Sequence, residues 1–150
     1  MAGGIKLNLK GFEKMLESIQ EAGGNLDNSA QRAIREAAKI TENELRAEAT
    51  ASGVPSDITS KIRSSTRKDG DTYEAEVGWE MCSYNPKDPS PGHLAVFLNY
   101  GTVRRTTKRG YNRGQLKGRQ FITRAKRKAR PKVKALQKEI FEKALEGLKK

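Results

Sequence analysis

Residues 68–79, KDGDTYEAEVGW, decide the fold class of this chain. Apolar side chains occupy every second position, at Tyr73, Ala75, Val77 and Trp79. Because the side chains of a strand alternate between two faces, this period-two pattern predicts a β-strand with one buried face. The Asp69-Gly70 pair just before it is typical of a tight hairpin turn, so we expect a second strand on the other side of the turn.

The segments before the hairpin predict one more strand and two helices. Residues 5–9 alternate apolar and polar side chains and predict a short strand. Residues 12–19 carry apolar side chains at helical spacing, and two glycines at 23–24 end that helix. A longer helix starts near Leu26 with an alanine-rich apolar stripe, has Asp27 or Asn28 as its candidate N-cap, and ends before Pro55.

A short helix is predicted after the hairpin. Ser90 and Pro91 suit a helix start, with the serine as cap and the proline at the first helical position. The helix covers residues 93–100, and Gly101 stands where a left-handed terminating residue belongs. We expect Tyr100 to lie in the core with the apolar residues of this helix.

The last helix is long. Apolar residues at spacings of three and four run from Phe121 to Leu148. Pro131 lies inside this run, lacks an N–H and crowds the preceding turn, so we expect a kink or a break near Arg130.

Together these elements predict an α+β fold. We expect a small antiparallel sheet packed against N-terminal helices and a long C-terminal helix, with a basic flexible loop at about residues 102–119. The length of 150 residues suits one domain, residues 1–150.

The positive charge is concentrated in one quarter of the chain. The net charge is +12, and residues 102–138 hold fifteen Lys or Arg and no Asp or Glu, which leaves 15 basic and 18 acidic residues elsewhere. Such asymmetry indicates contact with a polyanion, most often nucleic acid, although a solvated face would look the same. The candidates for facing DNA or a neighbouring protein are Arg104, Arg105, Lys108, Arg109, Arg113, Lys117, Arg119, Lys126 and Arg127.

The two parts of this basic quarter differ in character. Glycines at 110, 114 and 118 favour a pliable loop that can follow a phosphate surface without reading bases. The basic half of the last helix could cross a phosphate backbone, contact an acidic protein or simply face solvent.

Catalysis has little support in the sequence. His93 and Cys82 are the single histidine and the single cysteine, and they form no spacing typical of a metal site or a nucleophile with its base. No phosphate-binding or dinucleotide-binding glycine pattern occurs, so we expect no cofactor. The lone cysteine indicates a reducing compartment, and no run approaches the roughly 20 apolar residues of a membrane span. We expect a protein without a leader peptide that is soluble and intracellular when it is made.

Two short motifs carry a resemblance to a known family. Residues 96–102, VFLNYGT, and residues 121–125, FITRA, resemble motifs of the small tail-component family of tailed phages, whose members act at the head–tail joint. Asn99 stands where that family usually has an acidic residue, and Gln120 and Thr123 stand where prolines are common. The matching motif residues are Phe97, Tyr100, Gly101, Thr102, Phe121 and Ala125.

The resemblance implies a structural protein of the virion. It implies a neck or tail-completion protein, made in the host bacterial cytoplasm, that forms a six- or twelve-fold ring around the DNA passage and joins head to tail. The implied partners are further copies of the chain, other head-completion, adaptor or tail proteins, and double-stranded DNA contacted without sequence preference. The alternative is a free, basic nucleic-acid-binding protein of the cytoplasm.

Overall fold

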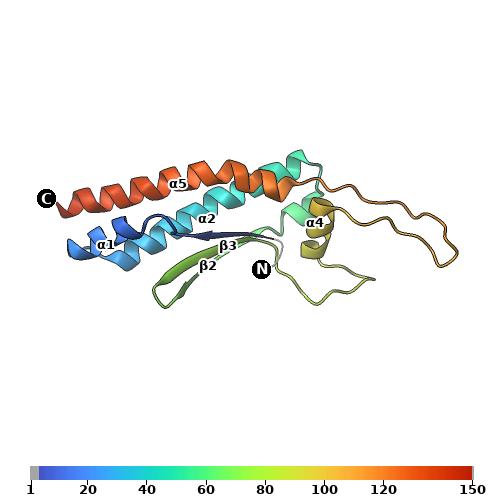
Figure 1. Cartoon of the computed structure of the whole chain (residues 1–150), viewed down its shortest axis with the longest axis horizontal. Helices are drawn as coiled ribbons and strands as arrows, with labels where there is room; N and C mark the ends of the chain where they lie inside the picture. Colours follow the sequence, from blue (N-terminus) through green and yellow to red (C-terminus); the bar gives the residue numbers. More distant parts are fainter. Residues whose placement is uncertain (1–3, 150) are drawn as a thin grey trace.

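A computed structural model describes residues 4–149 and contains one small sheet and five helices (Figure 1). The strands are β1 (Ile5–Asn8), β2 (Arg63–Asp69) and β3 (Thr72–Gly78). The helices are α1 (Glu13–Glu21), α2 (Leu26–Ala51), α3 (Ser56–Thr59), α4 (Pro91–Tyr100) and α5 (Phe121–Leu148). The α+β prediction is confirmed, including the hairpin and the long C-terminal helix; the short α3 was not predicted.

The sheet is antiparallel, with strand order β1-β3-β2. Ile5 pairs with Val77, and the hairpin closes where Asp69 pairs with Thr72 around Gly70 at φ +59°. β3 lies in the centre and buries alternate residues against α2, whereas every residue of β2 is exposed. The polar sequence of β2 suits this exposed edge, because an edge strand that carries charges resists pairing with other chains.

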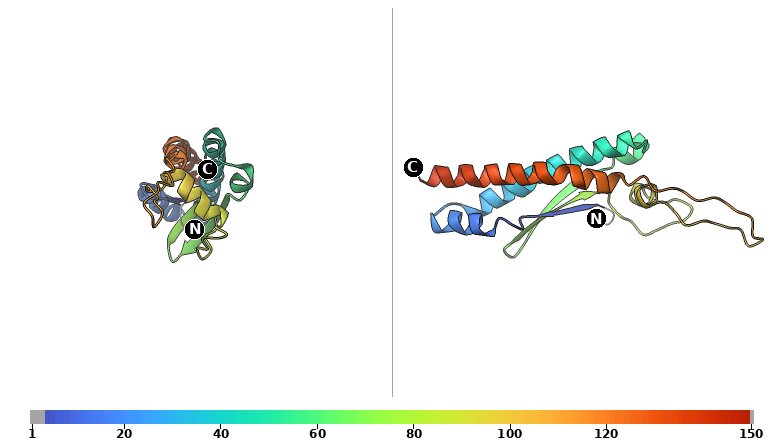
Figure 2. Two further views of the ribbon diagram at one scale, coloured as in Figure 1. Left: turned by 90° about the vertical axis from the view of Figure 1, so that its right-hand side faces the viewer. Right: turned by 45° about the horizontal axis from the view of Figure 1, so that its top comes forward.

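The two long helices form the body of the molecule. α2 and α5 lie along each other, and the sheet lies against α2 (Figures 1 and 2). The buried stripe of α2 contains five alanines, which allow the backbones to approach closely. The largest fully buried side chains include Trp79, Phe121 and Phe141. Trp79 meets Phe121 edge to face, and its indole N–H donates to the carbonyl of Ile58 at 2.8 Å.

The N-cap of α2 differs from the prediction. The cap is Asn25, whose Oδ1 accepts the N–H of Asn28 at 2.9 Å, rather than Asp27 or Asn28. The helix begins at Leu26, so both predicted residues already lie in its first turn. The carboxylate of Asp27 instead accepts hydrogen bonds from Lys68 at 2.8 Å and from the hydroxyl of Tyr73, which ties the tip of the hairpin to the start of α2.

The prediction of a break near Arg130 is wrong, and the alternative, a kink there, stays a prediction. α5 is one helix with Pro131 inside it, and the proline itself is exposed. The residues two before and two after it, Ala129 and Val133, are buried and pack against Ala37 of α2. This packing on both sides of the proline holds the helix together despite the hydrogen bond that proline cannot donate. No helix among residues 4–149 is both long and apolar enough to cross a lipid bilayer.

The prediction that Tyr100 lies in the core is also wrong. Its side chain is 61% exposed. The buried side of α4 is made by the small residues Gly92 and Ala95 and by Asn99, so the adjacent Tyr100 faces outward at the end of the helix.

Candidate functional site

The basic loop has the form of a hairpin arm. Residues 102–119, called the basic arm below, extend from the end of the molecule at which α4 ends and α5 begins (Figures 1 and 2). The N–H of Arg105 donates to the carbonyl of Gly114 at 3.0 Å, and the N–H of Arg113 donates back to Arg105 at 2.7 Å. Isolated bridges join Gly101 to Lys117 and Thr106 to Asn112. The arm therefore has internal backbone pairing that the sequence did not reveal.

The three regularly spaced glycines have separate structural roles. Gly110 (φ +84°) lies in the turn at the tip, where its N–H donates to Thr107, and Gly114 has φ +82°. Side chains are strained at such positive φ values, so glycine suits both sites. Gly118 lies at the base of the arm, where a Cβ atom would be 2.7 Å from the carbonyl carbon and oxygen of Tyr100. The arm can reach α4 this closely only because residue 118 has no side chain.

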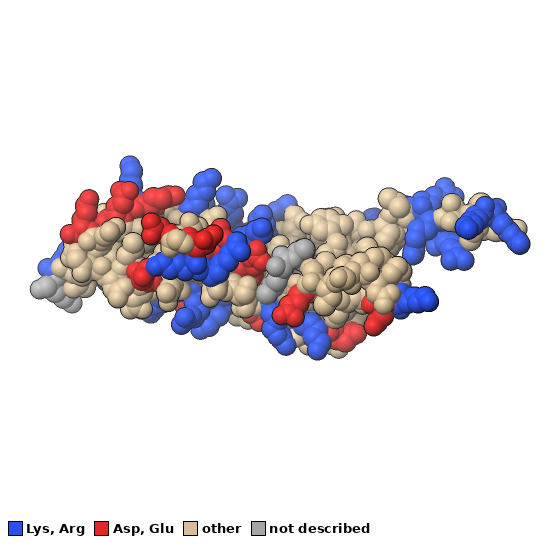
Figure 3. Space-filling view, turned by 90° about the horizontal axis from the view of Figure 1, so that it is seen from below, with Lys and Arg blue, Asp and Glu red and all other residues tan. Residues whose placement is uncertain are grey.

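Most of the predicted cations of the arm point into solvent. Six of them are exposed and form no ion pair with any residue in 4–149: Arg104, Arg105, Lys108, Arg109, Arg113 and Lys117. Figure 3 shows the arm as a blue projection without any red carboxylate on the face in view. Tyr111 and Val103 are also exposed on it, at 70% and 81%. The structure thus brings six predicted site residues together on one projection.

Arg119, the seventh predicted cation of the arm, lies elsewhere. Its guanidinium donates from Nη1 to the carbonyls of Ser52 and Gly53 at 3.2 and 3.0 Å. These carbonyls belong to the C-terminal end of α2, where a positive charge and extra donors are favourable. Arg119 therefore anchors the arm to the body.

Asn99 fixes the other side of the base. Its backbone carbonyl accepts the N–H of Gln120 at 3.0 Å, and its side-chain Oδ1 accepts the N–H of Ile122 at 2.9 Å. Asn99 thus supplies an acceptor to the first turn of α5, as an acidic residue at the same position would. Its amide nitrogen is buried without a partner among the described residues.

The residues that carry the family resemblance lie at this base. Phe121 and Ala125 are fully buried, and Phe97 is half-buried with Tyr84 at 6.0 Å between ring centres. At Gly101 (φ +79°) a Cβ atom would lie 2.5 Å from the carbonyl oxygen of Leu116. The motif therefore holds the arm in place, and Tyr100 is its one exposed aromatic residue.

The basic half of α5 separates into two rows. Arg124 and Lys128 bind the carboxylate of Glu48, and Lys132 binds Glu44, so every cation of this row, called the paired row below, has a carboxylate partner on α2. The two predicted residues of α5, Lys126 and Arg127, are exposed and form no ion pair within residues 4–149. Sequence reasoning missed the internal row because its acidic partners lie about eighty residues earlier in the chain.

Glu48 is the centre of the paired row. It is 6% exposed, and it accepts from Nε of Arg124 at 3.1 Å and from the ammonium of Lys128. The hydrogen bond from Lys128 lowers the pKa of Glu48 below its usual value of 4.5, and Arg124 adds to this effect while burial opposes it.

Glu48→Gln is expected to lower the free energy of unfolding at pH 7 by about 1–2 kcal/mol, since it leaves two cations without their carboxylate. A carboxyl whose pKa is lowered by folding stabilises the protein above pH 4.5 and loses that effect as the pH falls through the folded-state pKa. The difference between wild type and variant should therefore shrink below pH 4.5 in urea unfolding experiments. Glu146→Gln, at an exposed carboxylate, is the control. If the difference in free energy of unfolding between wild type and Glu48→Gln stayed the same in acid, the lowered pKa of Glu48 would be contradicted.

The two residues weighed for catalysis lie apart from the arm. His93 Nδ1 is 2.7 Å from the hydroxyl of Ser90, at the start of α4, and Cys82 is exposed in the preceding loop. Within residues 4–149, no three His, Cys, Asp or Glu side chains gather as metal ligands do.

The fold and the arm define a small α+β protein with an exposed cationic hairpin on a rigid helical base. A family model described as "Bacteriophage HK97-gp10, putative tail-component" matches residues 13–101, more than half of the chain. The chain belongs to this family of bacteriophage tail components, which confirms the resemblance, and it is accordingly a structural protein of the phage virion. No curated protein and no solved structure matches the chain.

Proposed function

We propose that residues 1–150 act as one connector-type domain at the head–tail junction of a tailed phage. Copies of the chain assemble as a ring around the DNA passage, with six- or twelve-fold symmetry, and join head to tail as a neck or tail-completion protein. The role is structural and not enzymatic. The partners are other copies of the chain and the adjoining head-completion, adaptor or tail proteins. The family and the basic arm support this role.

The observation that carries the proposal is the arrangement of the six unpaired cations on a projecting arm with no carboxylate in it. Phosphate contacts position a duplex without selecting its sequence, and a passage for genomic DNA needs that property. A flat basic face could only touch DNA beside the body, whereas an anchored arm reaches toward the axis of a ring.

The distribution of charge also supports head-to-tail assembly. The molecule is basic at the arm, whereas α1 at the opposite end carries three exposed glutamates and one lysine, beside the last turns of α5, where carboxylates and lysines are mixed (Figure 3). In a ring each subunit presents one face to a different face of the next, and faces of opposite charge favour that register.

One observation favours the alternative function, that of a free cytoplasmic nucleic-acid-binding protein. Tyr111 is 70% exposed near the tip of the arm, among the cations, where it could stack on an unpaired base. This alternative function requires no other virion protein. Whether phage particles assemble without the chain therefore distinguishes the two functions.

A phage that lacks this chain is expected to accumulate DNA-filled heads and separate tails, and supplying the wild-type chain from a plasmid should restore joined particles. Electron microscopy of the lysate counts both forms, and a gold-labelled tag on the chain should lie at the joint. Normal particles without the chain, or label only at the distal end of the tail, would contradict the proposed position.

A further inference from the structure

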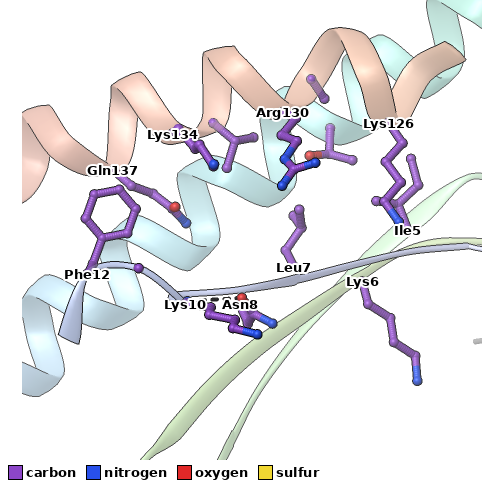
Figure 4. Close-up of a pocket in the computed structure, with 14 residues that line it drawn as sticks. Ile5, Lys6, Leu7, Asn8, Lys10, Phe12, Lys126, Arg130, Lys134 and Gln137 are labelled. Atoms are coloured by element: carbon purple, nitrogen blue, oxygen red, sulfur yellow. Dashed lines mark hydrogen bonds between the residues drawn. The ribbon is translucent and has the colours of Figure 1, made fainter. Parts of the chain in front are cut away.

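A groove between β1 and α5 lies apart from the basic arm. It has a volume of about 470 Å³ and is open to solvent along one side. Figure 4 shows β1 forming one wall and α5 the other. Its floor is apolar, with Leu7 from β1, Phe12 next to α1, and Ala129 and Val133 from α5.

The wall formed by α5 is cationic. Lys126, Arg130 and Lys134 follow one another at intervals of four residues and all line the groove. They are exposed and form no ion pair with any residue that the structure describes, in contrast to the row that binds Glu44 and Glu48. No Asp or Glu lines the groove, so its positive potential is not compensated locally.

Gln137 supplies a buried donor to the same groove. Its side chain extends from α5 toward β1 in Figure 4, and the residue is 2% exposed. The amide nitrogen Nε2 has no hydrogen-bond partner among residues 4–149. An unpaired buried donor costs free energy, and an acceptor that enters the groove would remove this cost.

β1 adds an unpaired strand edge. It lies at one end of the β1-β3-β2 order, within residues 4–149 it pairs only with β3, and residues 5–8 all line the groove. Every second N–H and C=O of such a strand points away from its partner, so an added extended segment can hydrogen-bond there.

We propose that this groove binds an extended acidic segment of a partner protein. Apolar side chains of the segment lie on the floor, its carboxylates contact Lys126, Arg130 and Lys134, and a backbone or side-chain oxygen accepts from Gln137. The volume suits a few side chains and not a nucleic-acid duplex, and a phosphate backbone would leave the apolar floor unused. This site is separate from the arm and does not depend on the arm's role.

The probe for the test is a short fluorescein-labelled peptide in which glutamate alternates with valine and leucine. Fluorescence anisotropy with the full chain should show binding, and the double variant Arg130→Glu/Lys134→Glu should weaken it by about tenfold or more. The matched control is Lys14→Glu/Arg35→Glu, which changes the net charge equally at exposed cations outside the groove and should leave the affinity within about twofold. A variant with its arm cations neutralised should bind the peptide as wild type does.

Three results would overturn the proposal: no binding of the acidic peptide, equal binding of a peptide with lysine in place of glutamate, or equal weakening by both double variants. Displacement of the acidic peptide by a DNA duplex in the variant with the neutralised arm would assign the groove to nucleic acid instead.

Gln137→Leu provides a second readout. Removing a buried, unpaired amide should raise the Tm of the free protein by about 2–4 °C, because leucine has a similar volume and no unsatisfied donor. The same change should weaken peptide binding severalfold, since the acceptor of the peptide then loses its donor. If Gln137 had only a structural role, its substitution by leucine would change the Tm without changing the affinity for the peptide. That result would count against the proposal.

Discussion

Duplex DNA is expected to bind the wild-type chain weakly at physiological salt, without preference between two unrelated sequences, and with an affinity that falls steeply as salt increases. The reason is counterion release, which contributes a slope of about −0.9 in log K against log salt concentration for each phosphate that a cation neutralises. Replacing five cations of the arm with glutamine should therefore make the slope shallower by about four. The replaced residues are Arg104, Arg105, Lys108, Arg109 and Arg113.

The control removes the same number of positive charges elsewhere on the surface. Its substitutions to glutamine are at exposed cations outside the arm, namely Lys14, Arg35, Lys61, Lys87 and Lys143. This control should change the slope by about one or less if the arm makes the phosphate contacts. Equal effects of the two variants would show that only net charge matters, and tight, sequence-selective binding at physiological salt would favour a free DNA-binding protein over a connector.

Gly118→Ala is expected to lower the free energy of unfolding by about 2–3 kcal/mol. The new Cβ atom would lie 2.7 Å from the carbonyl of Tyr100 and 2.8 Å from the carbonyl oxygen of Asn99, and these are backbone atoms that cannot move alone. The arm and α4 would have to separate, which disturbs the hydrogen bonds from Arg119 and Gln120 to the end of α4. Urea unfolding measures the loss, which is a large share of the 5–15 kcal/mol typical of a domain.

Gly147→Ala is the matched control, because it adds the same methyl group within α5. No heavy atom lies within 4 Å of the Cβ position at Gly147. Alanine favours a helix over glycine, so this variant should gain a few tenths of a kcal/mol up to about 1 kcal/mol. A Gly118→Ala variant as stable as wild type would show that the base of the arm is loosely packed.

The sequence predicted those parts of the fold that local patterns specify. The alternation from Tyr73 to Trp79 identified β3, and the Asp69-Gly70 pair identified the hairpin turn, because both depend only on neighbours in the chain. The helices followed from apolar spacing for the same reason. Pro131 misled the prediction because its local effect is offset by packing of Ala129 and Val133 on α2.

The sequence predicted which residues belong to the candidate site, but it did not predict which of them lie together in the fold. The exposed cations of the arm were predicted as one group, since they are adjacent in sequence, and their role as a contact surface stays a prediction. Arg119 was grouped with them, although its guanidinium binds Ser52 and Gly53. Its partners are distant in sequence, and a single chain without its relatives does not reveal such pairs. The groove was not predicted for the same reason, because β1 and α5 meet only in the folded chain.

The anchoring of the arm has a mechanical consequence. Arg119 binds the carbonyls of Ser52 and Gly53, directly after α2, and Gln120 leads directly into α5, so the base of the arm is joined to both of the longest helices. A force on the arm would therefore reach α2 and α5 at their ends nearest the arm, and through them the packed contact between these two helices. The sheet, with its exposed edge strand, lies outside this path. We expect a force on the arm to load the contact between α2 and α5, whereas a force on β1 would load its short pairing with β3.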